Sequence, residues 1–345
     1  MSRRRRRPDG NLAASRLSDG VVGMEVGRSV GSALVLIPGW VNFLYNQCGR
    51  RICEALTDLG IEVDLTTLSD CPRRKYDYCF ICNISEVVLN DETAAIEAIR
   101  SLRGHCKTMV SCGIDCVQTH WFARLLELSR QAGAEFILDL GLHDQSCFLG
   151  SSDRSMYRFA FSGLTPSEKR WLDSPEEAAG ERPIPWAFIG HSTVLRAGLV
   201  DYLIQEVCAN GFVYMPRLAP YSEKGSPHLN QQQLEAVLRR TQYQVWCSHH
   251  RHFYLEPERF RVSLLTGGVP IKVVELRKDL PGSIPFRHLL LEAGDLSTKL
   301  RDGLFVSMRS RFEQEWRSLP LLTGELEQVL GLACSAGSEL IRRTG

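Results

Sequence analysis

One short segment carries a glutamate, a proline and two arginines at spacings that suit the binding of a phosphate. These residues are Glu256, Pro257, Arg259 and Arg261, and they follow the apolar run Tyr243–Cys247. Proline suits the first position of a helix, because the N–H group that it lacks has no partner there, and this leaves Glu256 at the cap. A helix start attracts anions, and arginine gives phosphate oxygens bidentate, permanently charged contacts. We predict that the arginines bind an anion and that Glu256 caps the helix or accepts hydrogen bonds from ribose hydroxyls. The alternative is that Glu256 is only a cap and that the arginines face solvent.

The turn Gly190-His191-Ser192 is a second place where a ligand can approach the backbone. It follows the apolar run Trp186–Ile189, which we expect to be a strand, and precedes a helix expected from Leu195 to Val207. Ligands of α/β sheets bind at the carboxyl ends of strands. Gly190 permits close backbone approach, and Ser192 is a residue type that caps helices. We predict an anion contact here, with an ordinary strand-to-helix turn as the alternative.

Three histidines, His249, His250 and His252, cluster between the run Tyr243–Cys247 and Glu256. A zinc site needs further carboxylate or cysteine ligands at suitable spacing, which this segment lacks. We therefore predict no metal here and treat His249 as a ligand contact, against the alternative of surface histidines.

The 12 cysteines are scattered among apolar strand and helix patterns. Such a distribution is typical of reduced, buried thiols in a cytosolic protein. Cys79 and Cys82 lie in one expected strand, where an offset of three residues directs them to opposite faces of a sheet. We predict no metal site among the cysteines.

The elements that must position these residues alternate between apolar strands and amphipathic helices. Alternation of this kind predicts parallel sheets covered on both faces. The fold class is therefore α/β, with two Rossmann-like parallel-sheet domains and C-terminal helices. The expected boundaries are a disordered basic leader over 1–31, a first domain over 32–172, a polar linker over 173–184, a second domain over 185–300, and C-terminal helices over 301–345.

The segment His249–Ile271 resembles the donor-binding segment of GT-B glycosyltransferases, most closely the spore-coat-type and exostosin-like groups. A strand, a polar loop, a helix opened by Glu-Pro, the turn Gly-Gly-Val-Pro and an apolar strand carry the resemblance. It covers 183–300, and 33–172 by element order only. Many such enzymes have a glutamate five residues before the turn glycine, where this chain has Ser263. The resemblance implies that a nucleotide-sugar donor contacts Gly190, His191, Ser192, His249, Glu256, Arg259 and Arg261.

The resemblance also implies that the first domain binds the acceptor. Its polar loops 113–120 and 141–145 follow expected strands, and they contain Asp115 and His143. An inverting transferase needs a general base for the acceptor hydroxyl, and Asp or His at a cleft edge fits that role. Asp115 and His143 are our candidates for the catalytic base, with ordinary loop polarity as the alternative.

The expected function is metal-independent transfer of a sugar from a nucleotide sugar to an unknown acceptor, which is a saccharide, lipid, protein or small molecule. No bound cofactor is implied. The alternatives are a non-catalytic nucleotide-sugar-binding or scaffold protein of the same fold and a nucleotide-sugar epimerase. A dehydrogenase is disfavoured, because Ile37-Pro-Gly-Trp stands where a G-x-G-x-x-G turn would follow the first strand.

Charge and hydropathy bear on location and partners. The formal net charge of +1 includes the block Arg3–Arg7, so the rest of the 345-residue chain is mildly acidic. A short basic run is weak support for nucleic-acid binding, and we do not expect that partner. No apolar signal region follows the arginines and no run of about 18 apolar residues occurs, so a cytoplasmic protein without a membrane span is expected.

Overall fold

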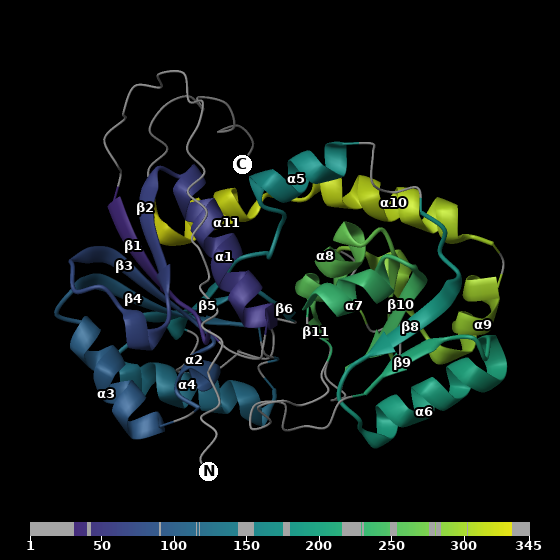
Figure 1. The fold of residues 1–345 in the computed structure, drawn as a ribbon, viewed down its shortest axis with the longest axis horizontal. Helices are drawn as coiled ribbons and strands as arrows, with labels where there is room; N and C mark the ends of the chain where they lie inside the picture. Colours follow the sequence, from purple (N-terminus) through teal and green to yellow (C-terminus); the bar gives the residue numbers. More distant parts are fainter. Residues whose placement is uncertain are drawn as a thin grey trace, which may run out of the picture.

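Two parallel sheets, each with helices on both sides, make up the molecule in the computed structural model (Figure 1). The structure describes residues 31–39, 43–89, 91–114, 116, 118–143, 155–174, 180–215, 229, 231–248, 254–275, 280, 284–301 and 303–332. The predicted leader 1–31 lies outside these residues except for Gly31, which opens the first strand.

The N-terminal sheet has six parallel strands in the order β2-β1-β3-β4-β5-β7. The strands are β1 (Gly31–Leu36), β2 (Ile61–Thr66), β3 (Tyr76–Cys82), β4 (Cys106–Gly113), β5 (Phe136–Asp139) and β7 (Tyr157–Phe159). The helices of this half are α1 (Phe43–Asp58), α2 (Ile84–Val87), α3 (Glu92–Leu102) and α4 (His120–Ala132), with a 3₁₀ turn at Leu68–Asp70.

Alternate residues of the central strands pack into two separate cores, one on each face of the N-terminal sheet. In β1, Val35 packs with residues of α1, and Leu36 packs with residues of α3 and α4. Cys82 and Cys79 divide between the same two cores, as the strand period requires. A sheet buried on both faces needs apolar residues at successive positions, which explains the apolar runs in the sequence.

The C-terminal sheet has five parallel strands in the order β13-β12-β10-β8-β9. They are β8 (Ile184–Ile189), β9 (Phe212–Tyr214), β10 (Thr241–Cys247), β12 (Val269–Val273) and β13 (Leu290–Leu291). The helices are α6 (Val194–Tyr202), α7 (Gln231–Leu238), α8 (Pro257–Leu265) and α9 (Ala293–Arg301), with a π-helix at Leu203–Val207 and a 3₁₀ turn at Arg287–Leu289. The predicted helix over 195–207 is therefore α-helical only as far as Tyr202.

The chain crosses between the two halves near α5 (Pro166–Asp173) and again between α10 (Phe305–Ser318) and α11 (Leu322–Leu330) (Figure 1). Phe312 and Trp316 of α10 pack in the C-terminal core. Leu322 and Leu326 of α11 pack in the core beneath α1. The two crossings are adjacent, because the Leu322 N–H donates to the Leu164 carbonyl at 3.0 Å.

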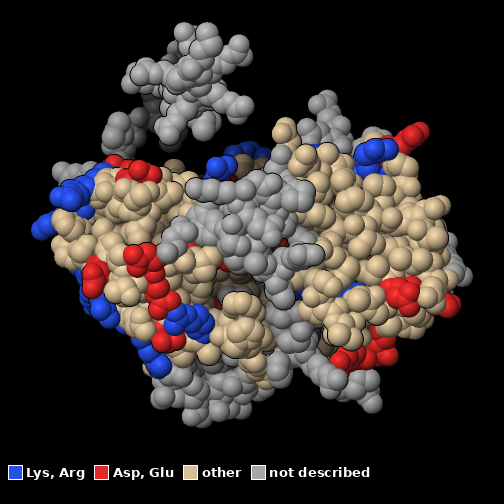
Figure 2. Space-filling view, turned by 60° about the horizontal axis from the view of Figure 1, so that its bottom comes forward, with Lys and Arg blue, Asp and Glu red and all other residues tan. Residues whose placement is uncertain are grey.

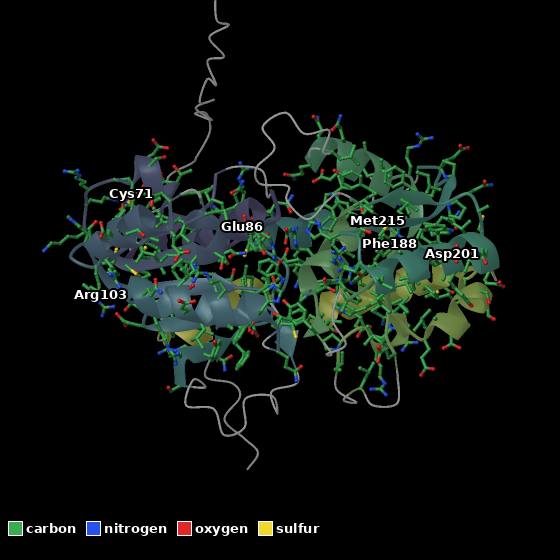
Figure 3. The ribbon with its side chains drawn as sticks, turned by 90° about the horizontal axis from the view of Figure 1, so that it is seen from below. Cys71, Glu86, Arg103, Phe188, Asp201 and Met215 are labelled. Carbon is green, nitrogen blue, oxygen red and sulfur yellow. The ribbon has the colours of Figure 1, made fainter. Side chains whose placement is uncertain are left out.

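A two-stranded antiparallel ladder joins the halves at a third place, on the edge where the parallel strands end. It consists of β6 (Leu142–His143), from the loop after β5, and β11 (Tyr254–Leu255), from the segment before α8. The carboxyl edges of the two sheets therefore face one another across this ladder. Figure 3 shows Glu86 of the N-terminal half and Phe188 and Met215 of the C-terminal half nearer to this boundary than Cys71, Arg103 and Asp201.

The predicted α/β class with two Rossmann-like parallel-sheet domains is confirmed. Among the described residues, no helix is both long and apolar enough to span a membrane.

Candidate functional site

The turn after β8 brings an arginine against the carboxyl edge of the C-terminal sheet. Arg196, in the first turn of α6, has an exposed fraction of only 3%. Its guanidinium donates to the carbonyls of Cys247 at 3.1 Å and His191 at 3.3 Å. A β-carbon on Gly190 would lie 3.2 Å from this guanidinium, so glycine leaves room for it. The cap predicted at Ser192 is wrong: the N-cap is Thr193, whose hydroxyl accepts from the Arg196 N–H at 3.3 Å.

The start of α8 gathers two more cations around one carboxylate. Pro257 occupies the first turn and Glu256 the N-cap position, as predicted, but the Glu256 side chain makes no capping bond. It accepts instead from Lys272 of β12 at 2.7 Å, from the Trp246 indole N–H at 2.8 Å and from Arg259 at 3.0 Å. The second arm of Arg259 donates to the Ile189 carbonyl at 3.0 Å. Arg259 therefore links the start of α8 to the turn at Gly190.

The surroundings of this group favour an added negative charge. Burial lowers the pKa of Arg196, and the positive charge of Arg259 lowers it further. Burial also lowers the pKa of Lys272, although Glu256 opposes this shift. Burial alone would raise the pKa of Glu256, but Lys272 and Arg259 outweigh it and hold that pKa far below its usual range. Glu256 is thus an anion shared by two cations, while Arg196 donates to the carbonyl groups of Cys247 and His191.

We call Arg196, Glu256, Arg259 and Lys272 the edge cluster. The side chains of Arg259 and Glu256 are 32% and 21% exposed, so a ligand can reach them. Three cations with one carboxylate leave a net positive charge beside the first turns of α6 and α8, which adds the partial charge of two helix starts. The charge of this arrangement suits a phosphate or diphosphate group and negative charge that develops on it.

Arg261 lies on a different side of α8 from the edge cluster. It bonds to Glu258 at 2.8 Å, to Glu168 of α5 at 2.7 Å and to Gln47 of α1 at 3.0 Å. Arg51 of α1 completes this group through ion pairs with Glu258 and Glu168. We call Arg51, Glu168, Glu258 and Arg261 the interdomain cluster. The side chains of the interdomain cluster are almost fully buried. Arg261 has its partners within or beside this cluster, so the structure does not bring it together with Arg259 and Glu256.

The other predicted contacts divide between described and undescribed parts of the chain. His191 is half-buried, and its carbonyl accepts from Arg196, whereas Ser192 is exposed. Asp115 and His249 lie outside the described residues. The backbone of His143 lies in β6, where it pairs with Tyr254.

Ser263 stands where the resembling enzymes have a glutamate, and it lies inside the C-terminal domain. It is fully buried, and its hydroxyl lies 2.8 Å from Gln244 Oε1 and 2.9 Å from the Arg259 carbonyl. The position is used for packing α8 on β10 in this structure.

Arg196 and Lys272 were not among the predicted site residues, although the sequence around each contains a signal. A cation in the first turn of a helix opposes the helix dipole, so Arg196 needs another reason to be there. Lys272 is a lone charge in the apolar run Val269–Val274, and a lysine in a buried strand must find a partner.

No protein-family model and no curated protein matches the chain. The solved structures that match include two of an alpha-glucosyltransferase in complex with UDP and a 13-mer DNA containing a HMU base. The first is 12% identical, with a TM-score of 0.57, over 87% of this chain and 98% of the other. The second is 12% identical, with a TM-score of 0.51, over 86% of this chain and 95% of the other. At this identity the likeness bears on the fold, and the chain has the two-domain GT-B fold of glycosyltransferases.

Proposed function

We propose that the protein is a glycosyltransferase that takes a sugar from a nucleoside-diphosphate sugar. The observation that carries the proposal is the edge cluster, which places three cations and one carboxylate at the carboxyl edge of the second sheet. In this proposal, Arg259 and the Gly190 turn contact the diphosphate and Arg196 contributes charge from beneath. Lys272 keeps Glu256 ionised and fixes the orientation of its carboxylate, so that Glu256 can accept a hydrogen bond from a ribose or sugar hydroxyl.

The same cations give the leaving diphosphate its stabilisation. Developing negative charge on the diphosphate is lowest in free energy beside fixed guanidinium and ammonium groups. We therefore propose that transfer needs no divalent metal. Activity that persists in excess EDTA is the expected result, and loss of activity that Mg²⁺ or Mn²⁺ restores would contradict it.

The acceptor side of the proposal rests on the two loops of the N-terminal domain that reach the ladder. Asp115 and His143 remain our candidates for the base that removes the acceptor proton. The solved neighbours hold DNA, so a DNA duplex joins saccharides, lipids, proteins and small molecules in the acceptor screen. On the face shown in Figure 2, acidic and basic side chains are interspersed over the N-terminal domain, and we do not propose a nucleic-acid acceptor from that surface.

The test is calorimetry of UDP and GDP against three proteins: wild type, Arg259→Ala and Arg240→Ala. Arg240 is an exposed arginine just beyond α7 and serves as the matched control. Charge-assisted hydrogen bonds are worth about 1.5–3 kcal/mol, so Arg259→Ala should weaken binding about 10- to 100-fold. Arg240→Ala should bind like wild type.

Two outcomes would contradict the proposal. If the wild-type protein binds neither nucleotide, it has no donor site of the proposed kind. If Arg259→Ala binds the nucleotide as tightly as wild type does, the donor site does not include Arg259. Release of UDP or GDP from the matching nucleotide sugars then separates a transferase from a binding or scaffold protein of the same fold.

A further inference from the structure

Tyr254 belongs to the C-terminal half of the chain, but its side chain lies in the N-terminal domain. Its hydroxyl donates to the Ile114 carbonyl, in the loop after β4. Its backbone pairs with His143, in the loop after β5. The two loops that carry the candidate bases therefore meet at this one residue.

Gly141 provides the space for the Tyr254 ring. A β-carbon on Gly141 would lie 2.6 Å from the Tyr254 hydroxyl oxygen, closer than any side chain tolerates. The Gly141 N–H donates to Asp139 at 2.8 Å, which fixes the turn against which the ring packs. Tyr254 is 5% exposed, so the ring is enclosed between the two domains.

The other end of the same segment is part of the edge cluster. The Lys272 ammonium donates both to the Tyr254 carbonyl and to the Glu256 carboxylate, the latter at 2.7 Å. It also lies 5.9 Å from the centre of the Tyr254 ring. The segment from Tyr254 to Glu256, together with Lys272, thus connects the N-terminal loops to the carboxylate that pairs with Arg259.

We propose that Tyr254 is a positioning residue that makes donor affinity depend on contact between the two domains. The inference rests on the proposed function, because it assigns the edge cluster a nucleoside-diphosphate ligand. When the domains meet, Tyr254 fixes the backbone of 254–256, and Lys272 then holds Glu256 where it directs Arg259. By linkage, a bound nucleotide must favour the same contact between the domains.

The first test is Tyr254→Phe, which keeps the ring on Gly141 and removes only the hydroxyl bond to Ile114. One hydrogen bond of this kind corresponds to a loss of about 2- to 10-fold in UDP affinity. The second is Gly141→Ala, which lies in the other domain and leaves the edge cluster's side chains unchanged. Crowding of the ring should weaken UDP binding about tenfold. Gly104→Ala is the matched control, since its β-carbon would meet nothing nearer than 3.7 Å.

A double-mutant cycle makes the route explicit. If Gly141→Ala acts by displacing the ring, then adding it to Tyr254→Ala should cause no further loss of UDP affinity. Independent losses that multiply in the double variant would overturn the proposal. Thermal unfolding of each variant is the second readout, because a merely structural role lowers the midpoint without changing the affinity of the folded protein.

The proposal and the proposed function fail in different ways. If the wild-type protein binds no nucleoside diphosphate, both the proposed function and the proposed role of Tyr254 are contradicted. If wild type binds UDP and both Tyr254→Phe and Gly141→Ala bind it equally tightly, the donor site stands and Tyr254 is not a positioning residue. Small-angle scattering adds a measurement that does not depend on the ligand: Gly141→Ala should increase the radius of gyration of the free protein, and an unchanged radius would overturn the interdomain role.

Discussion

Helix α8 carries two Glu–Arg pairs with the same spacing, and the structure uses them differently. Glu256 and Arg259 lie at its first turn, partly exposed, with Lys272 as an additional cation. Glu258 and Arg261 begin two residues later, are 4% exposed, and meet another arginine and another glutamate. The first pair has an excess of positive charge around it and is partly exposed to solvent. The second pair is balanced in charge and almost fully buried.

The comparison shows that residue type and spacing do not decide whether an ion pair binds a ligand or joins two domains. Two residues along a helix correspond to a rotation of about 200°, so the pairs face different neighbours. A balanced buried cluster has little affinity left for a further charge, and breaking it leaves an uncompensated ion in a poorly solvated place. The first pair predicts effects on binding, and the second predicts effects on stability.

The largest expected effect comes from Arg261→Met. Removing it leaves Glu258 and Glu168 with Arg51 alone, and losing one partner of a buried pair costs about 3–5 kcal/mol. Urea unfolding should show this loss, whereas Arg259→Met should change the free energy of unfolding by less than about 1 kcal/mol. Equal losses in the free energy of unfolding of the two variants would contradict the different roles of the two pairs.

Acid should weaken the interdomain cluster next. Burial alone would raise the pKa of Glu258, but Arg51 and Arg261 lower it to about 2. A carboxylate with a depressed pKa stabilises the fold above its unfolded pKa of about 4.3, and this contribution is lost as the pH falls towards the folded value. We expect the free energy of unfolding to fall by up to about 3 kcal/mol from this group between pH 5 and 2, to order of magnitude. Glu258→Gln should be less stable at pH 7 and less sensitive to acid; an unchanged acid slope would contradict this.

Arg259→Lys sharpens the comparison on the ligand side. Lysine keeps the charge but cannot reach both Glu256 and Ile189 with a planar fork. UDP affinity should fall by about 3- to 10-fold, corresponding to roughly one neutral hydrogen bond, with stability unchanged. A loss as large as that of Arg259→Ala would mean that the two-armed geometry, and not the charge, holds the nucleotide.

The smallest effect is expected from Gly190→Ala. The new methyl group would lie 3.2 Å from the Arg196 guanidinium, which must shift by a few tenths of an ångström. We expect UDP affinity to fall by about twofold, since the bonds of Arg196 to carbonyl groups are strained but not removed. Gly198→Ala in α6, whose methyl group would meet nothing within 4 Å, is the control. A larger loss in the control would show that the turn itself is not responsible.

Local patterns were enough to predict α8 and its neighbours. Glu256-Pro257 marks its start and Gly267-Gly268 its end, and the structure has the helix from Pro257 to Leu265. These signals act within a few residues, so a single sequence contains them. The alternation of strands and helices predicted the two parallel sheets for the same reason.

The interdomain cluster could not be predicted in this way. Arg51 and Glu258 are 207 residues apart, and nothing near either residue indicates the other. The role of Arg261 depends on that distant partner, and so does the separation of the two pairs on α8. Tyr254 was missed for a related reason, because β6 and β11 are two residues each and lack a readable strand period.

The place of α11 has a consequence for how the protein is made. Leu322 and Leu326 complete the core beneath α1, so the first domain is built from segments at both ends of the described chain. During synthesis, domains usually fold in order as they leave the ribosome. Here the core of the N-terminal sheet stays incomplete, with the apolar surface of α1 open to solvent, until the second domain has been translated and α11 covers that surface.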